Sequence, residues 1–177
     1  MLNDVVFERH EVNDERIDAF SAAISTTHVN GGLLLACFRP QIPLRGYELT
    51  RIALPEGIRA FVSNVSIRQA LPDLGITDPV IFGNGCWQSS YELEGSLVST
   101  LVSGGAYKSW RNQEEQARLV ARNFVDVLAE GRREGLVVYR IFGAWTGWFF
   151  DIAWDSTHVA FHFDTGMWWI ICSTDTD

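Results

Sequence analysis

The fold is decided by the segment THVAFHFDTGMWWIIC, which occupies residues 157–172. From Thr157 to Phe163 the apolar Val159, Phe161 and Phe163 alternate with other residues, as in a strand whose successive side chains point to opposite faces. The turn residues 164–166 (Asp-Thr-Gly) follow, and then comes an almost wholly apolar run, 167–172. Such a run is typical of a central strand covered on both faces, so the segment predicts a buried antiparallel hairpin.

Further strands and one long helix are expected before this hairpin. Residues 136–142 and 148–154 are rich in β-branched or aromatic side chains, which extends the hairpin to a meander of three or four strands. Ahead of them, Asn112-x-x-Glu115 resembles a capping box, apolar residues recur at helical spacing to Leu128, and Gly135 can end a helix of about 20 residues. The sequence therefore predicts an α+β fold, with a C-terminal antiparallel β-meander packed against a long amphipathic helix.

The N-terminal half has weaker signals. We expect a helix over 14–26, a buried strand over 33–38, a possible partner strand over 47–54, a helix over 55–70 and a short strand over 80–82 before the turn Gly83-Asn84-Gly85. Residues 88–103 fit a helix face, although their serines and glycine weaken that interpretation. No linker or internal repeat divides the chain, so residues 1–177 are expected to form a single globular domain.

Composition narrows the class of protein. The 177 residues include 14 Lys plus Arg and 22 Asp plus Glu, which gives a net charge of −8, and 47% are apolar. These values argue against a disordered chain and against a nucleic-acid binder that relies on a basic surface. The sequence shows no bilayer-length apolar run, no signal-peptide pattern and no C-x-x-C pair, so the expectation is a cytoplasmic protein without a membrane partner.

Charge and aromatic residues are concentrated near the C-terminus. From residue 141 onward there are five acids and no Lys or Arg, and five of the seven tryptophans lie there as well. Tryptophan is favoured both in cores and at the centres of protein interfaces. The sequence thus points to the last fifth of the chain as a candidate binding surface.

Catalytic and metal chemistry receive less support. Asp151, Asp155, His158, His162 and Asp164 are of suitable types, but His158 and His162 would lie about 13 Å apart along a strand, too far to share one ion. We therefore expect no metal, no cofactor and no assigned catalytic residue. A pair of carboxylates could still serve a hydrolase, which remains an alternative.

Three further groups are interpreted as structural. Asp175 and Asp177 are expected to be solvated in a polar tail, and Cys86 to be a buried thiol at the glycine turn. The sequence contains neither a Gly-x-Ser-x-Gly nucleophile elbow nor a glycine-rich phosphate loop.

Two resemblances concern short segments. Residues 149–155 (FFDIAWD) and 168–177 (WWIICSTDTD) resemble the ending of a set of small bacterial proteins of unassigned activity, so this likeness implies no catalytic residue. Residues 54–62 (LPEGIRAFV) are similar to a Leu-Pro helix of the SMI1/KNR4 (SUKH) immunity proteins, which would imply an immunity-type, protein-binding role.

The leading hypothesis is a non-enzymatic, immunity-like or antitoxin-like protein that binds a basic, toxin-like partner through an acidic and aromatic C-terminal sheet. Its candidate binding residues are Trp145, Trp148, Asp151, Trp154, Asp155, His158 and His162. The alternatives are a small metal-dependent or carboxylate-using hydrolase and a small-molecule binding module with a tryptophan-lined pocket.

Overall fold

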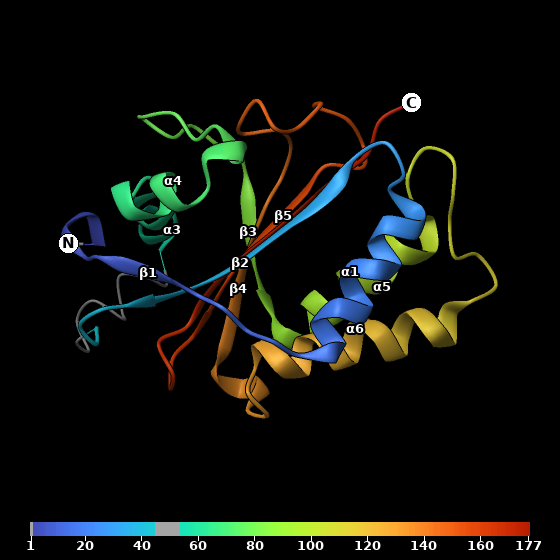
Figure 1. Ribbon diagram of the computed structural model, residues 1–177, viewed down its shortest axis with the longest axis horizontal. Helices are drawn as coiled ribbons and strands as arrows, with labels where there is room; N and C mark the ends of the chain where they lie inside the picture. Colours follow the sequence, from blue (N-terminus) through green and yellow to red (C-terminus); the bar gives the residue numbers. More distant parts are fainter. Residues whose placement is uncertain (1, 45–53) are drawn as a thin grey trace.

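A computed structural model describes residues 2–44 and 54–177 (Figure 1). The helices are α1 (Glu15–Thr27), α3 (Pro55–Val62), α4 (Val65–Ala70), α5 (Ser90–Ser103) and α6 (Glu114–Leu128), with short 3₁₀ turns η1 (Leu2–Asp4), η2 (Pro72–Leu74) and η3 (Arg133–Gly135). The strands are β1 (Phe7–His10), β2 (Gly32–Pro40), β3 (Gly85–Ser89), β4 (Leu136–Ile141), β5 (Ser156–His162) and β6 (Trp168–Thr174).

All six strands form one antiparallel sheet in the order β1-β2-β6-β5-β4-β3. The expected hairpin is β5–β6, in which His162 N donates to Met167 O at 2.9 Å and Gly166 takes a positive φ of 71°. Every residue of β6 is buried, which confirms the central, doubly covered strand. The α+β class and the meander β4-β5-β6 packed against helices are likewise confirmed.

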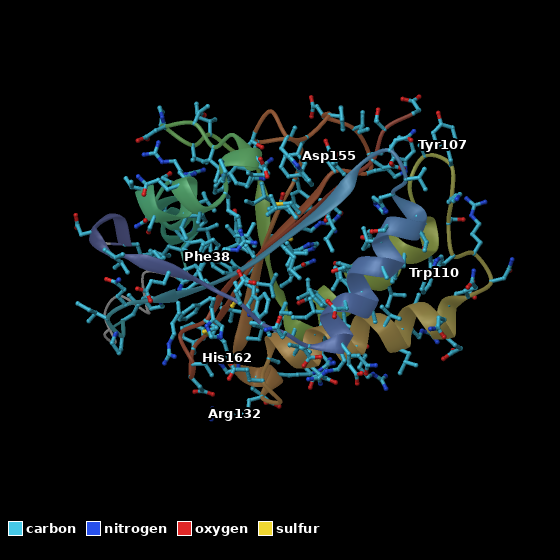
Figure 2. The ribbon with its side chains drawn as sticks, viewed as in Figure 1. Phe38, Tyr107, Trp110, Arg132, Asp155 and His162 are labelled. Atoms are coloured by element: carbon cyan, nitrogen blue, oxygen red, sulfur yellow. The ribbon has the colours of Figure 1, made fainter. Side chains whose placement is uncertain are left out.

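Helices cover both faces of the sheet and create two cores (Figure 1). On one face, α1, α5 and α6 bury Phe20, Leu93 and Phe124 against the sheet. On the other face, α3 and α4 bury Phe61 and Ile67 against Trp168 and its neighbours. Figure 2 shows side chains filling the space between the helices and the sheet, with Phe38 among them. Because apolar burial is available on both faces, β5 and β6 carry almost no solvent-facing side chain.

Local signals explain several helix starts. Asp14 caps α1 through its side chain, which accepts from Arg16 N, as its position before the first apolar residue predicts. A capping box lies at the start of α5, where Ser89 and Glu92 exchange hydrogen bonds, and residues 90–103 form a helix. The capping box expected at Asn112 is wrong: Asn112 has a left-handed φ of 67°, and Gln113 precedes the helix without a side-chain cap bond.

Other expectations also need correction. The helix over 55–70 is two helices, because the chain breaks at Ser63 and Asn64 then caps α4. The strand in this region is β3, three residues after the expected 80–82. Residues 148–154 form turns without a ladder, since Trp145 and Phe149 turn inward to the core. The expected strand over 47–54 falls outside the described residues, apart from Leu54.

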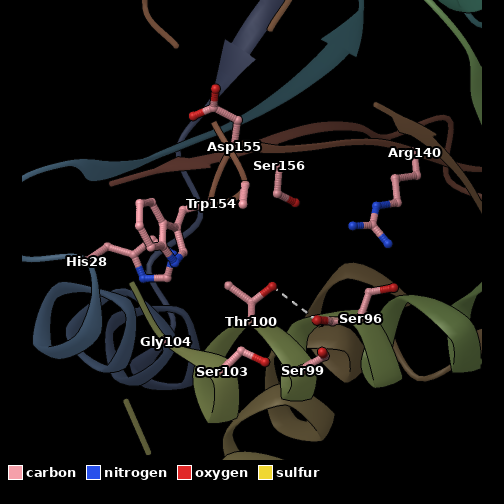
Figure 3. A pocket seen from close by; sticks show the side chains of 11 residues that line it. His28, Ser96, Ser99, Thr100, Ser103, Gly104, Arg140, Trp154, Asp155 and Ser156 are labelled. Atoms are coloured by element: carbon pink, nitrogen blue, oxygen red, sulfur yellow. Dashed lines mark hydrogen bonds between the residues drawn. The ribbon is translucent and has the colours of Figure 1, made fainter. Parts of the chain in front are cut away.

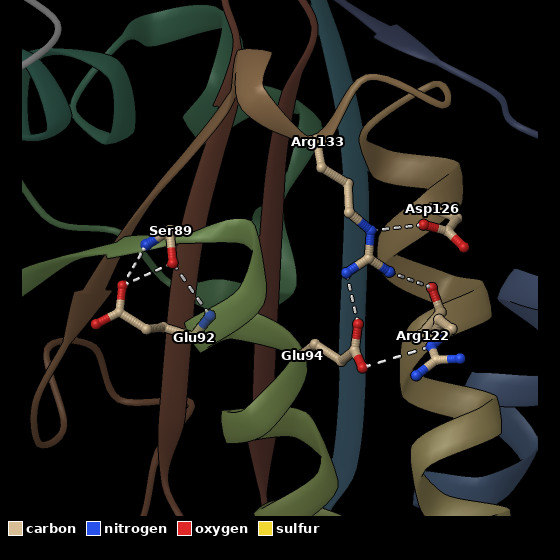
Figure 4. Close-up of polar contacts among 6 residues, drawn as sticks. All are labelled: Ser89, Glu92, Glu94, Arg122, Asp126 and Arg133. Atoms are coloured by element: carbon tan, nitrogen blue, oxygen red, sulfur yellow. Dashed lines mark hydrogen bonds and ion pairs between the residues drawn. The ribbon is translucent and has the colours of Figure 1, made fainter.

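An arginine joins the ends of three elements on the α5–α6 side (Figure 4). Arg133 donates from Nε to Asp126 Oδ1 at 2.7 Å and from a terminal nitrogen to Glu94 Oε2 at 2.5 Å. Arg122 lies 3.7 Å from the same Glu94. Because the Arg133 side chain is only 15% exposed, these bonds hold α5, α6 and η3 in one arrangement.

No helix in the described residues is both long enough and apolar enough to cross a bilayer.

Candidate functional site

The sequence-predicted binding residues do not form one surface. Trp145 is buried, and its indole N–H donates to Thr157 Oγ1 at 2.9 Å. Trp148 and Trp154 are half-buried, and they line two separate cavities. Asp151 is exposed at a left-handed turn with φ of 59°. The seven residues therefore lie in different environments, and only those that are exposed or line a cavity can contact a ligand.

The two histidines of β5 are buried, so the prediction that His158 and His162 belong to a binding surface is wrong. His158 Nδ1 lies 3.5 Å from Ser156 Oγ, and no partner for its Nε2 exists among the described residues. His162 Nε2 bonds to the backbone oxygen of Arg132 at 3.0 Å. Burial, reinforced by the charge of Arg140, lowers the pKa of His158 to about 3. His158 is therefore neutral at physiological pH.

The acids and histidines proposed for hydrolysis or metal binding do not converge. Asp155 is fully engaged: its Oδ2 accepts from Ile152 N at 3.0 Å and its Oδ1 accepts from Thr174 Oγ1 at 2.6 Å. Within residues 2–44 and 54–177, no three His, Cys, Asp or Glu side chains are grouped so that they could hold a metal ion. The two C-terminal segments singled out by resemblance thus meet at Asp155 and Thr174 in a structural contact.

Asp175 is also structural, and the expectation of a solvated tail is wrong for it. Its side chain is completely buried and accepts from Asn30 N and Ala106 N, both at 2.8 Å. A Cβ at Gly105 would overlap Asp175 Oδ2, so glycine is needed for this close approach. The carboxylate thereby joins the turn after α1 to the loop after α5.

A polar cavity of about 300 Å³ opens beside these contacts (Figure 3). One wall is a stripe of hydroxyls on α5, and the opposite wall comes from the sheet and from the loop before β5. The residues that line it are Ser96, Ser99, Thr100, Ser103, Gly104, Arg140, His28, Ala153, Trp154, Asp155 and Ser156. Figure 3 shows Arg140 at one end, Trp154 and His28 at the other, and the Asp155 carboxylate directed away.

Helical spacing and strand pairing together explain why these groups meet. The α5 hydroxyls recur at helical spacing, i, i+3, i+4 and i+7, so they share one face of the helix. Arg140 lies on β4 opposite His158 of β5, and alternation along β4 places it on the same sheet face as the buried Val138, which packs toward α5. His28 is the C-cap residue that follows α1. The cavity is therefore built from four separate parts of the chain.

The electrostatics of the cavity favour an anion. Arg140 is half-buried and stacks over Phe142 at 5.3 Å, and no carboxylate of the described residues forms an ion pair with it. Burial lowers the pKa of His28, against the opposing effect of the negative charge of Asp175. The guanidinium and the hydroxyls together offer several donors within a confined space.

Sequence reasoning identified only Trp154 and Asp155 among the residues that line this cavity. The hydroxyl spacing on α5 was visible in the sequence and could have indicated a polar helix face. Arg140 and His28 had no local signal, because only the folded sheet brings them to α5.

The chain matches none of the protein families with which it was compared, and no curated protein matches it.

Proposed function

We propose that this protein binds a small anionic molecule that carries a flat ring, in the cavity between α5 and Trp154. The observation that carries the proposal is the half-buried Arg140, which faces hydroxyls rather than a carboxylate. A guanidinium in such a place pairs well with a carboxylate or phosphate of a ligand. The cavity volume, about 300 Å³, is at the lower end of what small-molecule sites need.

Trp154 supports the ring in this proposal. The indole is half-buried and stands at the far end of the cavity from Arg140, beside His28 (Figure 3). Aromatic faces stack on flat ligands, and the attraction adds to the area that is buried. The tryptophan-lined binding module is therefore favoured over the hydrolase, because the acids and histidines that a hydrolase would use do not come together in one site.

The test uses paired ligands that differ only in the anionic group. Adenosine monophosphate and adenosine, together with indole acetate and indole, would be titrated by calorimetry and by chemical shifts of Trp154. We expect the anions to bind and the neutral partners to bind at least about tenfold more weakly. Arg140→Gln should remove this preference, while Arg118→Gln, an exposed arginine of α6, should not. Equal binding of charged and neutral ligands would contradict the proposal.

The protein-binding role is a second candidate, favoured by one observation. Phe142 and Phe150 are 45% and 53% exposed on the connection between β4 and β5, close in sequence to the exposed Asp151. Exposed aromatic residues beside acids would suit a basic protein partner of the immunity type. Co-expression with a candidate basic partner, comparing Phe150→Ser with Leu119→Ser on α6, would test it. Loss of complex for both variants, or for neither, would exclude Phe150 as the anchor.

A further inference from the structure

In the part of the chain that the structure describes, the first half of β2 has no strand beside its outer edge. β1 is short, and its pairing with β2 ends at His10 opposite Cys37. The chain then leaves the sheet and enters α1 (Figure 1). Within the described residues, Gly32 to Ala36 pair only with β6, so this part of β2 is an open edge of the sheet.

The pairing shows which backbone groups point outward at this edge. Gln41 N donates to Val6 O at 2.9 Å, so these two residues form a hydrogen-bonded pair in the β1–β2 register. In an antiparallel ladder such pairs alternate with non-bonded pairs along the strand. Every second residue back from Gln41 therefore faces the same side, and the series reaches Leu35 and Leu33.

The opposite side of β2 gives the same result. Because His162 and Met167 form a hydrogen-bonded pair, the residues of β6 that face β5 are 169, 171 and 173. The alternate residues of β6 face β2, where they meet Gly32, Leu34, Ala36 and Phe38. Leu33 and Leu35 are left with N–H and C=O groups directed outward, and the described part of the chain supplies no partner for them.

Cavities lie on both sides of this edge. The larger, about 630 Å³, is lined by Leu34, Leu71 and Trp148 on the α4 side of the sheet. The smaller, about 100 Å³, is lined by Leu35, Ile17 and other residues on the α1 side. Successive side chains of a strand point to opposite faces. A strand added at this edge would therefore direct neighbouring side chains toward two cavities of unequal size.

Charge selects one end of the edge. Arg9 lines both cavities, and its side chain is 48% exposed. Its ion pair with Glu11 is long, 3.6 Å, and exposed, so it stabilises little and can be exchanged. A segment antiparallel to β2 would continue the line of β1 and begin beside Arg9, where a carboxylate would be matched by the guanidinium.

We propose that the open edge of β2 binds an extended segment of a partner protein by antiparallel strand addition. The segment carries an acidic residue beside Arg9, a small residue opposite Leu35 and a large apolar residue opposite Leu34. Main-chain bonds to Leu33 and Leu35 give affinity, and the unequal cavities give specificity. This surface is separate from the cavity beside Trp154.

The first experiment measures amide hydrogen exchange in the free protein. We expect the amides of Leu33 and Leu35 to exchange at least about 100-fold faster than those of Leu34 and Ala36, which bond to β6. Protection of all four amides in a monomer would overturn the proposal, because the edge would already be covered. Protection that accompanies a dimeric mass would overturn it as well, since a second copy of the chain would then be the occupant.

The second experiment selects ligands from a displayed library of random heptapeptides. We expect enrichment of an acidic residue followed by a small and then a large apolar residue, and slowed exchange at Leu33 and Leu35 on binding. N-methylation of the peptide residue opposite Leu35 should weaken binding at least about tenfold, because that N–H bonds to the edge. N-methylation of the residue opposite Leu34, whose N–H points away, is the matched control and should leave binding unchanged.

A variant of the protein tests the main-chain hydrogen bonding at Leu35 by changing the protein instead of the peptide. Leu35→Pro removes an outward N–H and keeps the bonds to β6, a position at which edge strands tolerate proline. We expect it to weaken binding of the selected peptide at least about tenfold with unchanged circular dichroism. Equal effects of the two N-methyl peptides, or selection of peptides without the expected pattern, would refute strand addition.

Discussion

His158 should make the protein less stable in mild acid. The imidazole is completely buried on β5, and burial together with the charge of Arg140 lowers its pKa from 6.5 to about 3. The folded protein therefore holds His158 neutral, whereas the unfolded chain takes up a proton below pH 6.5. The stability that this difference supplies is complete above the unfolded pKa and is lost progressively as the pH falls from about 6.5 toward 3.

The magnitude follows from the distance between the pH and the unfolded pKa. At about pH 5 the medium is about 1.5 units below 6.5, and each unit corresponds to about 1.4 kcal/mol, so His158 should cost about 2 kcal/mol of stability relative to pH 7.5. Any folded pKa below about 4 gives the same value, because the folded protein then takes no proton at pH 5. The lowered pKa of His28 adds to the loss in the same direction.

Urea unfolding at pH 7.5 and pH 5 measures this effect. We expect His158→Gln to reduce the pH-dependent loss by about 2 kcal/mol, leaving the part due to His28 and other groups. His10→Gln, at an exposed position of β1, is the control and should keep the full loss. An unchanged loss in His158→Gln, or an NMR titration of His158 near pH 6.5, would refute the reasoning.

Three further predictions concern stability and reactivity. Asp175→Asn should lower the free energy of unfolding by about 1–3 kcal/mol, measured in urea, because a buried carboxylate that accepts two backbone N–H bonds is lost. Ser89→Ala should cost about 1 kcal/mol in the same assay through loss of the capping box. Native protein should expose one rapidly reacting thiol to a disulfide reagent, Cys86, because burial raises the pKa of Cys37 and Cys172 to about 12.

Matched measurements separate these effects from general damage. Asp177→Asn and Ser25→Ala change exposed residues of the same types and should alter the free energy of unfolding by less than about 0.5 kcal/mol. In denaturant all three thiols should react at similar rates. Rapid reaction of three thiols in the native protein would contradict the burial of Cys37 and Cys172.

The central hairpin could be predicted from the sequence because its signals are local. Alternation in β5, the turn at Gly166 and the apolar run of β6 each follow from neighbouring residues. Helix starts were less certain, because Ser89/Glu92 and Asn112/Glu115 both fit the capping pattern. The difference lies in the backbone: Ser89 is extended, whereas Asn112 is left-handed, and composition does not distinguish the two conformations.

Predictions from aromatic and acidic residues were wrong at positions whose conformation depends on tertiary contacts. Residues 148–154 predicted a strand, yet they form turns, and Trp145 and Phe149 hold this connection against the core. Asp175 was predicted to be solvated, yet it is buried and accepts hydrogen bonds from backbone N–H groups of two distant loops. The cavity beside Trp154 could not be assembled from sequence for the same reason, since His28 and Arg140 reach it only after the sheet has formed.

The pairing of β2 with β6 has a consequence for how the chain folds. These strands are far apart in the sequence, with Gly32 beside Thr174, and β2 joins the short edge strand β1 to the central strand β6. Contacts of such long sequence separation slow folding, because a large loop must close before they form. During synthesis, β1 and β2 therefore lack the partner strand β6 until residues 168–174 have been made. The leucines of β2 are then exposed, which makes this nascent interval the period of greatest risk of aggregation.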